Sequence, residues 1–128
     1  MPNANYQKGY RAELNILHEL KTLGYIAARS AASHSAFDVW AVREKDVVLV
    51  QAKRGGKPSP CDYKSAKEAK VPDSVIVLVV WFPDGLQAPQ VLWYNRLPDW
   101  LQDKENGTAP RVRWFVTAPP RQTSMRLV

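Results

Sequence analysis

The amino-acid sequence predicts a mixed α/β domain in which a β-sheet is flanked by helices. An amphipathic helix comes first, and short β-branched segments follow it along the chain. The chain has 128 residues, of which 45% are hydrophobic, which suits one domain with its own core. No internal repeat or low-complexity tract interrupts it. We expect a single domain at residues 1–118 and a basic, flexible tail at residues 119–128.

The first predicted element is a helix over residues 6–23. At about 100° per residue, its apolar side chains fall on one arc and most of its polar side chains on the opposite arc. Gly24 is expected to end it, because glycine readily adopts the positive φ that closes many helices. Glu13 lies inside the apolar arc, where a carboxylate is costly unless it is paired or binds a cation. The alternatives are an ion pair with a buried Arg or Lys, and a carboxylate at the edge that reaches water.

Strands are expected along the rest of the chain, with two short helical segments between them. The expected elements are strands at 25–28, 37–42 and 47–53, a basic helix at 62–70, strands at 75–82 and 90–94, a helical turn at 97–102 and a strand at 111–116. The run at 75–82 is continuously β-branched and apolar, typical of a strand buried on both faces. Asp62 is expected to cap the basic helix at its N-terminus.

The segments 37–42 and 47–53 are predicted to form a hairpin through a four-residue turn at residues 43–46. The register that this turn implies sets Asp38 directly opposite Gln51. Lys53 lies two residues beyond Gln51, so it points to the same face of the strand. A slip of one residue would destroy this alignment, so the prediction depends on the register.

The net charge of the chain is +6, from 18 Lys and Arg against 12 Asp and Glu. Such a domain is a candidate polyanion binder, because basic side chains that neutralise phosphates release condensed counterions. The single cysteine, Cys61, excludes an intrachain disulfide and fits a reducing setting. The first residues lack the pattern of a signal peptide, and the longest apolar run is too short to span a bilayer. We expect an intracellular, DNA-associated protein with no membrane partner.

Glu13, Asp38, Gln51 and Lys53 would carry hydrolytic chemistry if the helix and the hairpin converge. Three oxygen donors suit a hard divalent cation such as Mg²⁺, with Mn²⁺ as a substitute. The metal can polarise a phosphoryl oxygen and activate water. Lys53 could orient that water or stabilise charge on the phosphate. The structural alternative is that Asp38 caps a turn and Lys53 merely pairs with Asp38.

The first half of the chain resembles the archaeal-type Holliday junction resolvases of the PD-(D/E)XK nuclease superfamily. The matching motifs are Lys-Gly-Tyr-Arg-Ala-Glu at 8–13, Gly-Tyr at 24–25, Ala-Arg-Ser-Ala-Ala-Ser at 28–33, Asp-Val at 38–39 and Gln-Ala-Lys at 51–53. The resemblance implies a restriction-endonuclease-like core, Mg²⁺-dependent hydrolysis of DNA phosphodiesters and a homodimer that cuts a four-way junction symmetrically. It also implies that Glu13, Asp38 and Gln51 bind the metal, while Lys53 assists the attacking water.

The chain departs from the resolvase pattern in two places. Gln51 stands where the resolvases have Glu, which removes one negative charge from the site, and its Gln-x-Lys-Arg context is similar to Mrr-type restriction endonucleases. The loop from Ser33 to Asp38 is also short for a resolvase. The alternatives are therefore a general or restriction-type nuclease, a non-cleaving DNA-binding relative, and a basic structural protein whose Glu13 is simply ion-paired.

Basic and hydroxyl side chains near this site are expected to contact the DNA backbone. These residues are Lys8, Arg29, Ser30, Ser33, Arg54, Lys57, Lys64 and Lys67. Lys64, Lys67 and Lys70 share helical spacing, although a merely solvated helix face is the alternative. Four tryptophans, at positions 81, 93, 100 and 114, are expected in the core or a subunit interface, and residues 75–94 are the suggested dimer interface.

Overall fold

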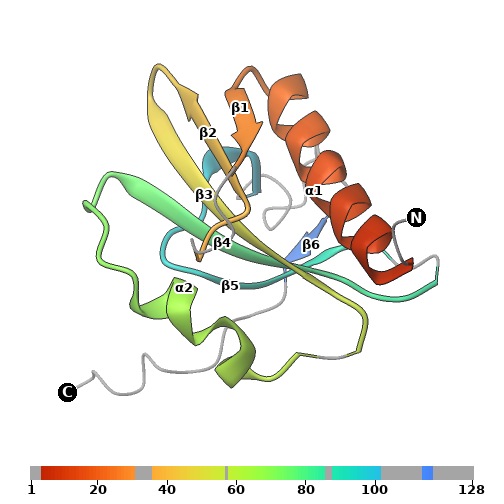
Figure 1. Cartoon of the computed structure of the whole chain (residues 1–128). Helices are drawn as coiled ribbons and strands as arrows, with labels where there is room; N and C mark the ends of the chain where they lie inside the picture. The colour runs from red at the N-terminus through yellow and green to blue at the C-terminus, as the bar shows by residue number, and fades with distance from the viewer. Residues whose placement is uncertain (1–3, 31–35, 57, 86–87, 102–113, 117–128) are drawn as a thin grey trace.

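The computed structural model describes residues 4–30, 36–56, 58–85, 88–101 and 114–116. Its elements are, in chain order, α1 (Ala4–Thr22), β1 (Ile26–Arg29), β2 (Val39–Arg43), β3 (Asp46–Arg54), the 3-10 turn η1 (Pro60–Tyr63), α2 (Lys64–Glu68), β4 (Val75–Phe82), β5 (Gln90–Tyr94) and β6 (Phe115–Val116). The predicted α/β class is confirmed, and Figure 1 shows the helices beside a twisted sheet. The predicted tail at 119–128 lies outside the described residues.

The described strands form one mixed sheet whose spatial order, β1-β2-β3-β4-β5-β6, is the order of the chain. The pairs β3–β4 and β5–β6 are parallel, whereas the other neighbouring strands are antiparallel. Parallel neighbours cannot be joined by a tight turn, so η1 and α2 supply the crossover between β3 and β4. As predicted, β4 is buried on both faces, and Ile76 to Val80 are at most 2% exposed.

Two apolar clusters lie on opposite faces of the sheet. One joins α1 to the sheet, and its members include Ile16, Leu20, Val39, Val48, Val50, Leu78 and Val80. The other joins η1 and α2 to the opposite face, through Tyr63, Ala66, Val77 and Val79. Successive side chains of a strand point to opposite faces, which is why neighbouring β4 residues belong to different clusters. Figure 1 shows α1 and α2 on different sides of the sheet.

The first helix ends as the sequence predicts. α1 stops at Thr22, and Gly24 follows with φ +99°, in the left-handed region that favours glycine. The Gly24 N–H donates to Lys21 O at 3.0 Å, and the Tyr25 N–H donates to Leu20 O at 3.1 Å. These bonds satisfy carbonyl groups at the end of the helix and direct the chain into β1.

The β2–β3 hairpin has the predicted register, because Val39 pairs with Val50 and Val42 pairs with Val47. Its turn is shorter than expected. Arg43 and Asp46 also pair, so only residues 44–45 connect the strands. The Arg43 guanidinium donates to the Asp46 carboxylate at 2.8 and 3.1 Å, which closes the end of the ladder.

The basic helix differs from the prediction at both ends. Ser59, rather than Asp62, is the N-cap residue, and it precedes the 3-10 turn η1. Asp62 instead accepts a hydrogen bond from the Ser59 N–H at 2.8 Å through Oδ2. α2 ends at Glu68, and the extended Ala69 follows it, so Lys70 lies outside the helix. Pro72 lies three residues beyond Ala69, so the helix ends before the restriction that proline imposes on Val71.

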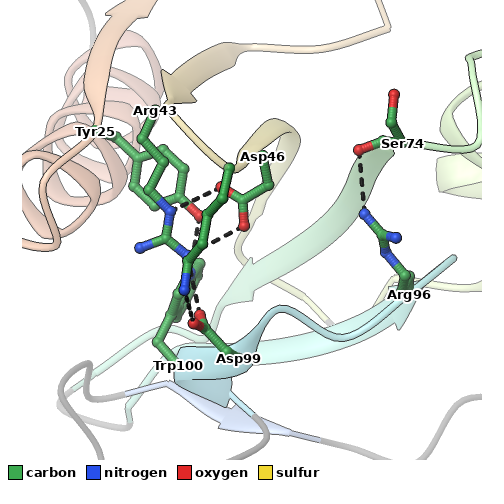
Figure 2. Close-up of polar contacts among 8 residues, drawn as sticks. Tyr25, Arg43, Asp46, Ser74, Arg96, Asp99 and Trp100 are labelled. Atoms are coloured by element: carbon green, nitrogen blue, oxygen red, sulfur yellow. Dashed lines mark hydrogen bonds and ion pairs between the residues drawn. The ribbon is translucent and has the colours of Figure 1, made fainter.

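Arg43 is the centre of a polar cluster at the hairpin end of the sheet (Figure 2). Besides Asp46, it donates to Asp99 Oδ1 at 3.0 Å, and Lys45 Nζ lies 2.6 Å from Asp99 Oδ2. The side chains of Arg43 and Asp46 are only 16% and 10% exposed. The cluster therefore joins the hairpin to the helical turn at residues 99–101, which lies within the predicted span 97–102.

Aromatic side chains continue this cluster into the core. The Arg43 guanidinium lies 4.4 Å from the centre of the Tyr25 ring, a favourable cation–π distance. The Trp100 Nε1–H donates to the Tyr25 hydroxyl at 3.0 Å, and Trp100 meets Trp114 edge to face at 5.7 Å. Both tryptophans are at most 3% exposed, which confirms their expected place in the core.

No helix in the described part of the chain has both the length and the apolar character needed to cross a membrane.

Candidate active site

Asp38 directly precedes β2 and is hydrogen-bonded to Val50 of β3 and to Ser30, which follows β1. Its N–H donates to Val50 O at 2.8 Å, and its carbonyl oxygen accepts from the Ser30 N–H at 2.8 Å. Its side-chain Oδ2 accepts from the Ala52 N–H at 2.7 Å. The regular ladder ends at the Val39–Val50 pair, so Asp38 does not form the directly opposed pair with Gln51 that the register predicted. Its carboxylate turns toward the backbone of β3 instead.

The charge of Asp38 is set by its burial and by the charged side chains around it. Burial raises the pKa of the Asp38 carboxyl above its usual range, and the nearby carboxylate of Glu13 raises it further. The Ala52 N–H, Lys53 and Arg29 act in the opposite direction. Glu13, Arg29 and Lys53 are therefore close enough to Asp38 to affect its ionisation. A divalent cation here would favour the charged carboxylate.

Glu13 forms an ion pair with Arg29 of β1. Arg29 Nε donates to Glu13 Oε1 at 2.7 Å, and the two side chains are 22% and 36% exposed respectively. The structural alternative, an ion pair with a basic residue, is thus present, although Arg29 is not buried. Arg29, which is expected to contact DNA, also offsets the charge of Glu13. The bond uses Oε1, so the second carboxylate oxygen of Glu13 is not needed for it.

Gln51 and Lys53 lie on the face of β3 that points away from α1. Gln51 pairs with Val79 and Lys53 with Trp81, whereas the neighbouring residue Val50 points to the opposite face, toward α1. Glu13 approaches from the α1 side, so the candidate residues lie on both faces of the sheet, and of the other three, Glu13 and Lys53 are close enough to Asp38 to affect its ionisation. Gln51 is 9% exposed, and its Oε1 has no hydrogen-bond partner in the part of the chain that the structure describes.

The oxygen donors of Glu13, Asp38 and Gln51 are of the kind that a hard divalent cation prefers. A buried acceptor without a partner is costly, and a metal ion or a donor from a ligand would satisfy Gln51 Oε1. The partly buried carboxylate of Asp38 would likewise gain from a cation. Within the described ranges, however, no three His, Cys, Asp or Glu side chains gather as a metal site. Only Glu13 and Asp38 supply carboxylates, because the third expected donor is the amide of Gln51.

A pocket of about 310 Å³ lies next to Lys53, where β3 ends. Its lining residues are Lys53, Arg54, Gly55, Gly56, Pro58 and Asp62. Gly55 has φ +68°, and the Trp81 Nε1–H donates to its carbonyl oxygen at 2.9 Å. Arg54 Nε is buried and has no hydrogen-bond partner among the described residues. The pocket could not be predicted from the sequence.

The other expected DNA contacts have varied surroundings. Lys8 lies on α1, with its side chain outside the description, and Ser33 and Lys57 lie outside the described residues. On α2, Lys64 Nζ is 3.9 Å from Glu68, and Lys67 Nζ is 5.7 Å from the centre of the Tyr63 ring. These contacts fit a solvated helix face as well as a phosphate-binding one.

Compared with protein-family models, with curated proteins and with solved structures, the chain has no significant match. The class that its own geometry defines is an α/β domain with a mixed sheet between helices, and its candidate site lies at the end of β3.

Asp38→Asn is expected to raise the free energy of unfolding at pH 7 in the presence of chelator. The folded-state pKa of Asp38 is raised, mainly by burial, so the fold favours the uncharged form. The stability that this group contributes is present below its unfolded pKa, about 3.9, and is lost as the pH rises through the folded pKa. Asparagine stays uncharged and keeps an oxygen for the Ala52 N–H. Urea unfolding at pH 7 and near pH 4 measures the difference, which should shrink at the lower pH.

The matched control is Asp73→Asn, because Asp73 is an exposed aspartate outside the site. It should leave the free energy of unfolding nearly unchanged at both pH values. If Asp38→Asn instead destabilises the metal-free protein at pH 7, the carboxylate is stabilised in its charged form without a cation.

Proposed function

We propose that the chain is a metal-dependent endonuclease that hydrolyses DNA phosphodiesters, with a restriction-endonuclease-like fold and a Holliday junction as its substrate. The observation that supports this most is the mixed cluster at the end of the sheet. Asp38 is fixed by the Ala52 N–H, with Glu13 and Lys53 near enough to affect its ionisation in opposite directions. The chain order of a helix Glu, an Asp directly before a strand and a strand ending in x-x-Lys is also that of the resembled nucleases, with Gln51 in place of their Glu.

Glu13, Asp38 and Gln51 are the residues that would hold Mg²⁺, with Mn²⁺ as a substitute. Bound there, the metal would polarise a phosphoryl oxygen and lower the pKa of a water molecule. The Ala52 N–H keeps the Asp38 carboxylate oriented toward β3. The Lys53 ammonium would orient the attacking water or stabilise the negative charge that develops on the phosphate.

Binding of the DNA backbone is proposed for the basic groups at the end of β3. Lys53 and Arg54 line the same pocket, so both lie beside any phosphate that enters it. The net charge of +6 would attract the polyanion from a distance. A homodimer remains part of the proposal, since a two-fold substrate suits a two-fold enzyme. The side chains of Ile76 to Val80 in β4 are buried within this chain, so a dimer interface would have to use other, exposed residues.

The decisive experiment compares a labelled four-way junction with a linear duplex of the same sequence. Each is incubated with the protein in Mg²⁺, in Mn²⁺ and in chelator. Paired, symmetric nicks that appear only in the junction and only with metal would support a resolvase. Metal-dependent cutting of both DNAs would support a general or restriction-type nuclease. No cutting with either metal would overturn the nuclease proposal.

A second candidate function, DNA binding without cleavage, is favoured by two observations. Gln51 supplies no negative charge, and Arg29 already neutralises Glu13. If the chain binds DNA but cuts none, Gln51→Glu tests whether Gln51 is the cause, because it introduces the carboxylate that the resembled resolvases have at this position. Metal-dependent cutting by Gln51→Glu alone would show that the site lost its activity through this residue.

A further inference from the structure

Apolar side chains are exposed on the face of the sheet that points away from α1. Trp40 is 40% exposed, Val42 39% and Ile26 73%. The pairings Ile26–Val42 and Trp40–Leu49 put these residues on one face, because directly opposed residues share a face. On this face, η1 and α2 pack against Val77 and Val79 of β4. Among the described residues, no helix packs in the same way on the part of this face that β1 and β2 form, and Ile26, Trp40 and Val42 stay exposed there.

Trp40 is the member of this patch nearest to the candidate active site. It lies two residues along the chain from Asp38, which corresponds to roughly 7 Å in an extended strand. Val42 is four residues from Asp38, roughly 13 Å, and Ile26 lies beside Val42 on the edge strand β1. Lys53 belongs to the same face of the sheet as Trp40, through the pairing of Leu49 with Trp40 and the alternation along β3.

The chemistry of this surface fits a nucleobase better than a second copy of the chain. An exposed indole ring is a stacking platform for any base, and base–aromatic stacking accompanies cationic grooves in proteins that bind single strands. The net charge of +6 attracts DNA, whereas two copies of this chain repel each other. In continuous duplex each base is already stacked on its neighbours, so only an unpaired base offers its face to Trp40.

We propose that Trp40 stacks on an unpaired base of the DNA strand bound at the Asp38–Lys53 site, and so selects branched or frayed DNA over continuous duplex. This proposal rests on the DNA binding of the proposed function, but not on its cleavage step. It makes Trp40 a specificity-determining residue rather than a catalytic one.

The test measures binding, in chelator, of a duplex with a single-stranded flap and of a blunt duplex with the same paired sequence. Fluorescence anisotropy gives the two dissociation constants, and their ratio is the selectivity for unpaired bases. Trp40→Leu should reduce this ratio about tenfold, because leucine is apolar but has no aromatic face. Trp40→Phe should keep most of the ratio. The matched control, Ile26→Leu, alters an exposed apolar residue on the same face without touching the site.

An unchanged ratio in Trp40→Leu, or an equal loss in Trp40→Leu and Trp40→Phe, would overturn the proposal. Sedimentation of each variant tests the alternative that the patch is a subunit interface. A dimer that dissociates in both Trp40→Leu and Ile26→Leu, with unchanged selectivity, would make the patch a subunit interface and also overturn it. The assay contains no cleavage step. Absence of nuclease activity would therefore overturn the proposed function, whereas the role of Trp40 would still be decided by the ratio of the two dissociation constants.

Discussion

Asp38→Asn is expected to abolish metal-dependent cleavage of DNA while the fold and the affinity for DNA stay nearly unchanged. The amide retains an oxygen for the Ala52 N–H, which lies 2.7 Å from the carboxylate, but it lacks the negative charge that holds a cation. A bound metal contributes several kcal/mol to phosphoryl chemistry, so the single-turnover cleavage rate should fall on the order of a thousandfold. The measurement is nicking of labelled junction under saturating protein, with circular dichroism as the check on folding.

Lys53→Ala provides an independent test of the same site. It removes the cation that would stabilise charge on the phosphate, and cleavage should fall on the order of a hundredfold. Its matched control is Lys70→Ala, which removes an exposed lysine that lies outside α2. Cleavage at the original rate in both Asp38→Asn and Lys53→Ala would show that the activity arises elsewhere. If metal-free Asp38→Asn is also more stable, as expected, the charged carboxylate of Asp38 lowers the free energy of unfolding of the metal-free protein.

Arg43→Ala is expected to lower the free energy of unfolding by about 3 kcal/mol, because it leaves a nearly buried carboxylate without its partner. Asp46 is only 10% exposed, and the Arg43 guanidinium donates two hydrogen bonds to its carboxylate. The variant also loses the bond to Asp99 and the cation–π contact with Tyr25. Urea denaturation at neutral pH, followed by tryptophan fluorescence, measures the change.

The control for Arg43→Ala is Lys45→Ala in the same cluster. Lys45 pairs with Asp99 as well, but the two side chains are 62% and 51% exposed, so its loss should cost less than about 1 kcal/mol. Similar losses in the two variants would show that burial of the Arg43–Asp46 pair contributes nothing beyond a surface ion pair. Neither variant should alter the selectivity for unpaired bases, because the cluster lies at the hairpin end of the sheet, away from Lys53.

The parts of the fold that the sequence predicts are those set by local periodicity. Hydrophobic spacing predicted α1, and Gly24 predicted its end. The short link between two β-branched segments predicted the register that pairs Val42 with Val47. A continuous apolar run predicted that β4 is buried on both faces. In each case neighbouring residues alone decide the outcome.

The parts that could not be predicted depend on contacts between distant residues. The ion pair of Glu13 and Arg29 joins residues sixteen positions apart and depends on how α1 crosses β1. The local departure of Asp38 from the ladder depends on its N–H bonding to Val50 O, which no pattern of residue types encodes. The exposure of Trp40 depends on which elements cover the face of the sheet that points away from α1. Periodicity alone gave no reason to expect an exposed Trp40.

The parallel pairing of β3 with β4 sets the order in which the protein can mature during synthesis. β2 reaches the ribosome exit just before β3, so the hairpin can close at once, but β4 emerges only after the segment that carries η1 and α2. Until then the edge of β3 that later pairs with β4 has no strand beside it. The nascent chain therefore passes through a stage with an open, apolar strand edge, the kind of edge that pairs with other chains. Slow synthesis across residues 55–74 would prolong that stage, and aggregation of nascent chains should be most sensitive to codon choice there.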